Sequence, residues 1–172
     1  MTLTITIIVG VGVAYLVYHY IHQLIVRRAT TIVRDDAQAT TEAAVSQALQ
    51  QLAREATLSE GQDHYTVAQT VADVWGRGVM AFEFTIVGDG LTPAQLPMLR
   101  RQLNNALGEY AGKHEVARYS ADSPTFVVTD LWLFEDQWHV DVAYLMNEAT
   151  VEYIRDLKRL NASEVPTQEK QD

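Results

Sequence analysis

The stretch TFVVTDLWLFEDQWHVDVAYLM, residues Thr125 to Met146, decides the fold, because it predicts two long neighbouring strands. Apolar and β-branched residues dominate both halves, and Glu135 and Asp136 interrupt them in the middle. This pattern is typical of an antiparallel hairpin with a tight turn. If these two residues form the turn, Phe134 pairs with Gln137, and the register places Asp130 opposite Asp141.

The predicted hairpin has two faces of different composition. One is almost wholly apolar and is expected to face the core: Val127, Thr129, Leu131, Leu133, Trp138, Val140, Val142, Tyr144 and Met146. The other mixes apolar and charged residues: Phe126, Val128, Asp130, Trp132, Phe134, His139, Asp141, Ala143 and Leu145. The second face is too apolar to be simply solvated, so helices of this chain or another protein should cover it. We predict Phe126, Trp132 and Phe134 as partner-binding residues.

Asp130, His139 and Asp141 on the second face are the strongest chemical candidates in the sequence. Two carboxylates beside an imidazole are able to hold a divalent cation or to carry out acid–base catalysis. Like charges opposite each other in a sheet are unfavourable by up to ~1 kcal/mol, so such a pair needs compensation. The alternative, which we prefer, is a solvated or partner-facing edge. We therefore assign no catalytic residue, metal or cofactor.

Further elements are predicted on either side of the hairpin. Residues 79–87 alternate like a strand, with Met80, Phe82, Phe84 and Ile86 on the core side. Thr92 and Gln95 form a capping box that starts a helix, whose apolar face consists of Leu96, Leu99, Leu103, Leu107 and Tyr110. Asp63 is expected to cap a short helix with Val67, Val71 and Trp75. Asn147 is expected to cap a last helix that ends near Leu160, with Val151, Ile154 and Leu157 inward.

The residues Leu3 to Val26 contain no Lys, Arg, Asp or Glu, and as a helix they reach about the ~30 Å of a bilayer core. We therefore predict a transmembrane helix. A buried strand is the competing interpretation, although strands are seldom this long. A cleaved signal peptide is the other, but it normally has a basic start and a small-residue cleavage site, and neither is evident.

Flanking charge sets the predicted orientation, because Lys and Arg favour the cytoplasmic side. Arg27 and Arg28 follow the apolar stretch and nothing basic precedes it, so the C-terminal domain should be cytoplasmic. Gly10 and Ala14 have the spacing that lets two membrane helices approach, which suggests a homo-oligomer. The residues predicted to form the membrane anchor are Leu3, Gly10, Ala14, Tyr15, Tyr18, Tyr20, Arg27 and Arg28.

Residues 29–58 contain neither Gly nor Pro, and Val45, Leu49, Leu52 and Ala56 form a narrow apolar stripe. A helical stalk that packs on its own domain or on a partner is the natural interpretation. The predicted organisation is a transmembrane anchor at 1–28, a helical stalk at 29–60, an α+β globular domain at 61–160 and a disordered tail at 161–172.

Composition excludes several classes of protein. The 172 residues contain no cysteine, which rules out disulfides, thiolate nucleophiles and cysteine zinc sites. The net charge is −9, and Arg100 and Arg101 are expected on the outer side of their helix without a continuous basic stripe, so no nucleic-acid partner is predicted. Phosphate-binding glycine loops and the common hydrolase motifs are absent from the sequence.

The predicted fold class is α+β, with a small, mainly antiparallel sheet packed with helices in the order α-α-β-α-β-β-α. This order resembles, at the level of fold alone, the NTF2-like shape of membrane-anchored scaffold subunits in secretion and conjugation systems; no family is assigned. We predict a single-pass, non-enzymatic protein-interaction subunit whose partners are the lipid bilayer and other protein subunits. The alternatives are a membrane-tethered, metal-dependent hydrolase using Asp130, His139 and Asp141, and a small-ligand-binding NTF2-like module.

Overall fold

The computed structural model describes residues 2–55, 65–70, 78–87, 91–135 and 137–163. Inside these ranges, the side chains of residues 2–9, 23–31, 67–70, 87 and 162–163 lie outside the description. The chain divides into two compact units, Met1–Asp36 and Ala37–Asp172. Helix α1, Thr2–Arg54, contributes residues to both units.

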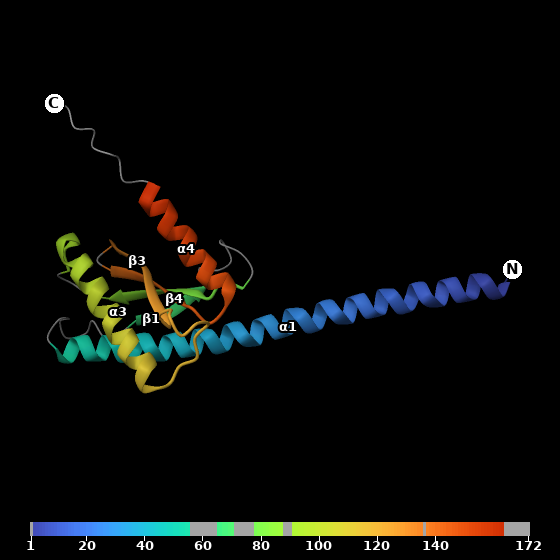
Figure 1. Cartoon of the computed structure of the whole chain (residues 1–172), viewed down its shortest axis with the longest axis horizontal. Coiled ribbons are helices and arrows are strands. Elements are labelled where there is room, and N and C mark those ends of the chain that lie inside the picture. The colour runs from blue at the N-terminus through green and yellow to red at the C-terminus, as the bar shows by residue number, and fades with distance from the viewer. Residues whose placement is uncertain (1, 56–64, 71–77, 88–90, 136, 164–172) are drawn as a thin grey trace, which may run out of the picture. The chain divides into compact units, whose positions relative to one another are not determined.

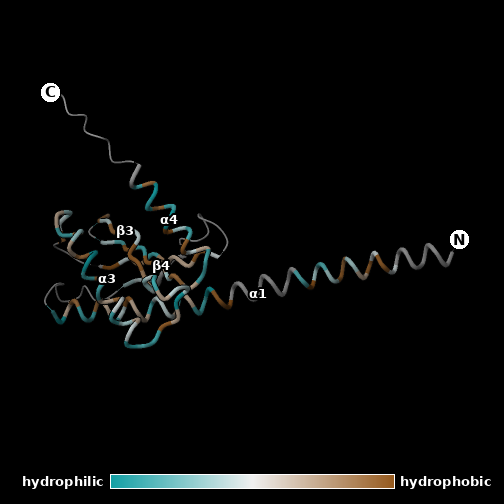
Figure 2. The backbone as a smooth tube through the Cα atoms, viewed as in Figure 1, coloured by the Kyte–Doolittle hydropathy of each residue, from teal (hydrophilic) through white to brown (hydrophobic). Residues whose placement is uncertain are grey.

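The first unit consists of the N-terminal part of α1. Its helix contains no proline, and its glycines, Gly10 and Gly12, do not interrupt it. From residue 11 to residue 21 its large apolar and aromatic side chains are between 49% and 68% exposed: Val11, Val13, Tyr15, Leu16, Val17, Tyr18, Tyr20 and Ile21. In Figure 2 hydrophobic residues alternate with more hydrophilic ones along this part of α1. Searched over its described residues, the chain has no helix whose length and apolar character suffice to cross a membrane.

The second unit is α+β, with a four-stranded antiparallel sheet of strand order β1-β2-β4-β3 (Figure 1). Its strands are β1, Tyr65–Thr70; β2, Ala81–Val87; β3, Phe126–Phe134; and β4, Gln137–Tyr144. The helices described in this unit, besides the C-terminal part of α1, are the short η1, Pro93–Gln95; α3, Leu96–Lys113; and α4, Glu148–Ser163. Phe134 pairs with Gln137 and Asp130 with Asp141, which confirms the predicted register around the turn.

One face of the sheet packs against α1 and α3 and forms the main core. Phe82, Phe84 and Ile86 from β2 and Trp138, Val140 and Val142 from β4 point to this face. The predicted stalk stripe joins them, since Val45, Leu49 and Leu52 are buried in the same cluster. The predicted apolar face of the later helix is confirmed as well, with Leu99, Leu103 and Leu107 buried.

Among the described elements, α4 packs on the other face of the sheet and covers part of it. A small second cluster joins Ile154 of this helix to Ala81, Ala143, Val79 and Leu145, with Val151, Leu157 and Val127 packed against it. Asn147 caps α4 as predicted, because its Oδ1 accepts hydrogen bonds from the Thr150 N–H at 2.9 Å and from the Thr150 hydroxyl at 2.8 Å.

Residues 65–70 correct the predicted element order. They form strand β1, whereas the sequence pattern predicted a short helix beginning near Asp63. Tyr65, Thr66, Val67 and Thr70 are aromatic or β-branched residues that favour strands, and β2 offers an unpaired edge for them. Tyr65 pairs with Ile86 across that edge. Val71 and Trp75 lie outside the described residues, as do residues 164–172 of the predicted tail.

A β-bulge corrects the predicted faces of the hairpin. The register between β3 and β4 shifts between Val128 and Asp130, which makes Thr129 an extra residue. Before the bulge, Phe126 and Val128 therefore point into the main core and Val127 packs in the second cluster, the reverse of the prediction. After the bulge, Leu131 and Leu133 return to the core side and Trp132 keeps its predicted face.

Two side chains of α3 hold the bulge in place. The guanidinium of Arg100 donates hydrogen bonds to the carbonyl of Val128 at 2.9 and 3.1 Å and to that of Thr129 at 2.6 Å. The amide oxygen of Asn104 accepts a hydrogen bond from the Val128 N–H at 3.0 Å. Arg100 was predicted on the outer side of its helix; the structure turns it toward the strand instead.

We expect Arg100→Ala to destabilise the domain by about 1–3 kcal/mol, because two part-buried carbonyls lose their charged donor. Arg101→Ala in the same helix is the matched control, since Arg101 is exposed and its loss should change stability by less than about 0.5 kcal/mol. Urea denaturation followed by tryptophan fluorescence measures both. Equal effects of the two substitutions would show that Arg100 does not hold the bulge.

Candidate functional site

The pairing of β2, β4 and β3 aligns two rows of side chains across the partly covered face of the sheet. The first is a carboxylate row, in which Glu83 pairs with Asp141 and Asp141 pairs with Asp130. The second is a histidine row, in which Thr85 pairs with His139 and His139 pairs with Trp132. The two rows are adjacent, since neighbouring residues of one face are two apart along each strand.

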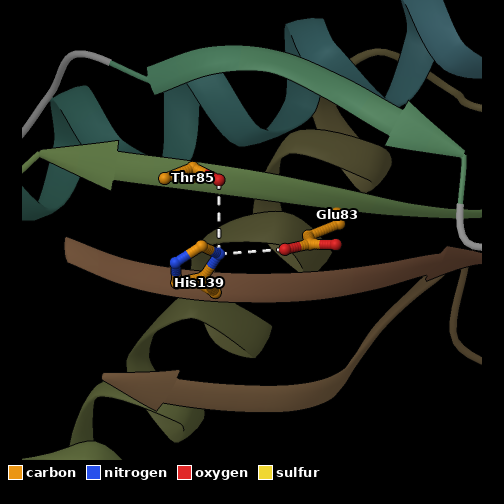
Figure 3. A network of polar contacts seen from close by, with 3 residues as sticks. All are labelled: Glu83, Thr85 and His139. Atoms are coloured by element: carbon orange, nitrogen blue, oxygen red, sulfur yellow. Dashed lines mark hydrogen bonds and ion pairs between the residues drawn. The ribbon is translucent and has the colours of Figure 1, made fainter. Parts of the chain in front are cut away.

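His139 lies at the centre of the second row, where Glu83, Thr85 and Trp132 surround its ring; Figure 3 shows the contacts with Glu83 and Thr85. Its Nδ1 contacts Oε1 of Glu83 at 2.9 Å and the hydroxyl of Thr85 at 3.3 Å. The ring stacks on Trp132, with 5.0 Å between centroids and 11° between planes. Because a carboxylate only accepts, the short contact requires a proton on Nδ1. Nε2 is then a buried nitrogen without a hydrogen-bond partner among the described residues.

Asp141 lies at the centre of the first row, between two other acids. Its Oδ1 is buried and has no hydrogen-bond partner in the described part of the chain. The pKa of Asp141 is raised from 3.8 to about 7, chiefly by burial and in addition by the negative charges of Glu83 and Asp130. Facing side chains on paired strands lie about 5 Å apart, where two charges repel by roughly 3 kcal/mol at an effective dielectric constant of 20. The row therefore retains a proton near neutral pH.

The ends of the carboxylate row differ in exposure. Asp130 is exposed, and its Oδ1 accepts a hydrogen bond from the N–H of Leu131 at 2.8 Å. From α4, Tyr153 lies close to Asp141: burial raises its pKa, the charge of Asp141 adds to this, and a hydrogen bond with Thr129 opposes it. The site thus combines acids from three strands with a phenol from the covering helix.

The structure brings only part of the predicted trio together. Asp130 and Asp141 face each other as predicted, but Glu83 and Thr85 are the polar partners of His139. Among the described residues, no group of three His, Cys, Asp or Glu side chains is placed to hold a metal ion. Because residues 79–87 alternate, Glu83 and Thr85 lie on the side of their strand opposite Phe82, Phe84 and Ile86. What the sequence did not indicate is that this strand pairs with β4.

The three predicted partner-binding residues do not share one surface. Phe134 is 59% exposed and Trp132 is half-buried on the partly covered face. Phe134 also meets the His139 ring edge-on, at 6.4 Å between centroids. Phe126 is 3% exposed and lies in the main core, so its predicted place beside Trp132 and Phe134 is wrong.

The residues predicted for the membrane anchor lie on the N-terminal part of α1. Gly10, Ala14, Tyr15, Tyr18 and Tyr20 are exposed, and a Cβ added at Gly10 would meet no atom within 4 Å. The side chains of Leu3, Arg27 and Arg28 lie outside the described residues.

An open groove of about 610 Å³ lies between the C-terminal half of α3 and the beginning of β3. Its lining includes Gly108, Gly112, Arg118, Thr125 and Phe126, and no residue of the two polar rows. This groove is the feature that bears on the small-ligand alternative.

Comparison of the chain with protein-family models, with curated proteins and with solved structures finds no match. The candidate site therefore rests on its own geometry.

We expect Asp141→Asn to stabilise the domain most at pH 8.5, by a smaller amount at pH 5, and to have little effect below about pH 4. The folded pKa of Asp141 lies above its unfolded value, so the native carboxyl disfavours ionisation, and stability falls as pH rises from about 4 through about 7. The gain at pH 8.5 should be about 1–2 kcal/mol, less than the full shift implies, because the side chain is partly exposed and solvent screens it.

Urea denaturation at a series of pH values measures this difference. Asp122→Asn is the control, since Asp122 is an exposed acid in the loop before β3 and should change the pH profile little. A wild-type profile that is already flat between pH 5 and 8.5 would contradict the shifted titration of Asp141.

Proposed function

We propose that the protein is a non-enzymatic, single-pass membrane-anchored interaction subunit of a membrane-associated complex, with its C-terminal domain in the cytoplasm. The observation that carries the proposal is the part of the sheet face that α4 leaves open. There the exposed Phe134 and the half-buried Trp132 adjoin the carboxylate row. Aromatic side chains next to charged groups are frequent anchors of protein interfaces.

Charge complementarity defines the partner that fits this face. Glu83, Asp130 and Asp141 lie side by side, and the whole chain carries a net charge of −9. A partner segment that places an Arg or Lys side chain over the row and an apolar side chain over Phe134 would relieve the repulsion between the acids. Arg also stacks favourably on an indole, which Trp132 provides.

The apolar N-terminal segment supports the membrane anchor. The uncharged stretch from Leu3 to Val26 includes Val11, Val13 and Ile21, whose side chains are about half exposed or more on the helix. A helix that exposes apolar side chains on successive turns is more stable in an apolar environment, such as a lipid bilayer, than in water. Arg27 and Arg28 follow the stretch, which favours a cytoplasmic C-terminal domain. Pairing of two copies through Gly10 and Ala14 belongs to the same proposal.

A photo-crosslinking amino acid at position 134, in native membranes, tests the interface. We expect a reproducible protein neighbour that is crosslinked through a segment containing Arg or Lys, and a loss of at least about tenfold when Trp132→Ala is added. The same crosslinker at Met98, an exposed apolar position on α3, is the matched control. The proposed interface fails if both positions capture the same neighbours, or if Trp132→Ala leaves the yield unchanged.

Extraction of membranes at alkaline pH tests the anchor. The full chain should remain in the membrane pellet, and Val13→Asp should release most of it, because a central Asp disfavours insertion by about 3 kcal/mol. Ile32→Asp is the control, since Ile32 is 69% exposed but lies beyond Arg27 and Arg28. Release of the wild-type chain, or equal behaviour of the two variants, would remove the membrane anchor from the proposal.

A further inference from the structure

Helix α4 is held to the sheet by few apolar contacts. Along its described side chains, only Thr150 and Ile154 are buried, and the sheet offers mainly the small residues Ala81 and Ala143 beneath it. Elements with little buried apolar surface are the first to open in a folded protein. Helix α4 is therefore the covering element that separates from the sheet most easily.

The first turn of α4 is fixed much more firmly than the rest. The Thr150 hydroxyl accepts a hydrogen bond from the buried N–H of Met80 at 2.9 Å. The side-chain amide of Asn147 donates to the carbonyl of Gly78 at 2.8 Å while its oxygen caps the helix. These contacts form a pivot at the N-terminal end of α4, about which the following turns are able to move.

Beyond the pivot, α4 packs on Ala143, which is two residues from Asp141 on the same face of β4. Asp141 has a buried Oδ1 without a partner in the described structure. Tyr153 of α4 forms a hydrogen bond with Thr129, whose hydroxyl donates to the backbone carbonyl of Asp141 at 3.2 Å. The other groups that face Asp141 are Glu83 from β2 and Asp130 from β3. On its own strand, His139 has its Nδ1 proton directed to Glu83.

We propose that α4 is a proton-controlled cover, which stays packed while Asp141 is protonated and separates from the sheet beyond its first turn when Asp141 ionises. An ionised Asp141 would have a buried oxygen without a donor and an acid on either side. Part of the Asp141 side chain is exposed, but its Oδ1 is not, and an ionised Oδ1 without a donor requires water because burying an unpaired charge is strongly unfavourable. Movement of α4 lets water reach Asp141 and sacrifices fewer buried apolar contacts than movement of α1 or α3 would.

Opening of this cover enlarges the interaction surface. Ala81, Ala143 and Leu145 would become accessible on the face that already carries Trp132 and Phe134. A cationic partner side chain would favour the open state, since it stabilises the ionised row. This use of the opened face rests on the proposed function, whereas the movement of α4 does not.

Amide hydrogen exchange on the full chain in lipid nanodiscs, read by mass spectrometry, tests the cover. After correction for the intrinsic pH dependence of exchange, we expect the protection of residues 152–160 to fall by at least about tenfold between pH 5.5 and pH 8.5. Peptides from α3 should show no comparable change. Constant protection of 152–160 in the wild-type chain would overturn the proposal.

Three variants make the test specific. Asp141→Asn should abolish the pH dependence, and Asp156→Asn, an exposed acid on α4 that pairs with Arg159, should retain it. Asp130→Asn should move the pH-dependent loss of protection to lower pH, because the removal of one neighbouring negative charge makes Asp141 easier to ionise. If Asp141→Asn does not fold, Asp130→Asn tests the proposal in its place. A pH dependence that persists in folded Asp141→Asn, or an unmoved transition in Asp130→Asn, contradicts the proposal. Since no partner is present, the result is independent of the crosslinking at position 134.

Discussion

The extra residue in β3 at Thr129 is the constraint on which the site depends. Without it, the side chains from Phe126 to Phe134 would alternate regularly between the two faces of the sheet. Phe126 and Val128 would then lie on the same face as Trp132. The bulge instead lets both ends of the strand send apolar side chains into the main core while Asp130 remains opposite Asp141. Arg100 and Asn104 of α3 bind the backbone at this irregularity, so the packing of α3 and the position of Asp130 are linked.

The carboxylate row is an arrangement that the sheet imposes and that the surroundings make tolerable. Antiparallel pairing of β2, β4 and β3 leaves Glu83, Asp141 and Asp130 no room to separate. The outer acids are relieved differently, Asp130 by exposure and a backbone N–H, Glu83 by the His139 ring. The Oδ1 of Asp141, in the middle, is neither exposed nor hydrogen-bonded among the described residues. The repulsion is therefore reduced by a raised pKa, which keeps a proton on Asp141. The three carboxyl groups thus differ in exposure and in hydrogen bonding, and this difference places the raised pKa on Asp141.

Much of the hairpin was predictable from sequence, because local signals determine it. Glu135 and Asp136 between two apolar runs predict the turn, and the turn sets the pairing of Asp130 with Asp141. Thr92 and Gln95 likewise predict the start of the η1–α3 segment, where the Gln95 side chain accepts a hydrogen bond from the Thr92 N–H at 2.8 Å. These features depend on residues that are close in the chain.

The features that sequence did not predict depend on contacts between distant residues. The bulge requires Arg100, 29 residues before Thr129, and nothing around Thr129 signals it. The pairing of β2 with β4 brings Glu83 to His139 across 56 residues. Strand β1 lies where the local pattern predicted a helix, and pairing with the edge of β2 makes the segment a strand instead.

The contact between Arg100 and the backbone of β3 has a consequence for how other chains are able to associate with this domain. Strand β3 forms one border of the sheet, and a border strand offers outward N–H and C=O groups to any extended peptide. Here Arg100 occupies the carbonyls of Val128 and Thr129, and Asn104 occupies the N–H of Val128. These groups are therefore withheld from a fifth strand at this point of the border.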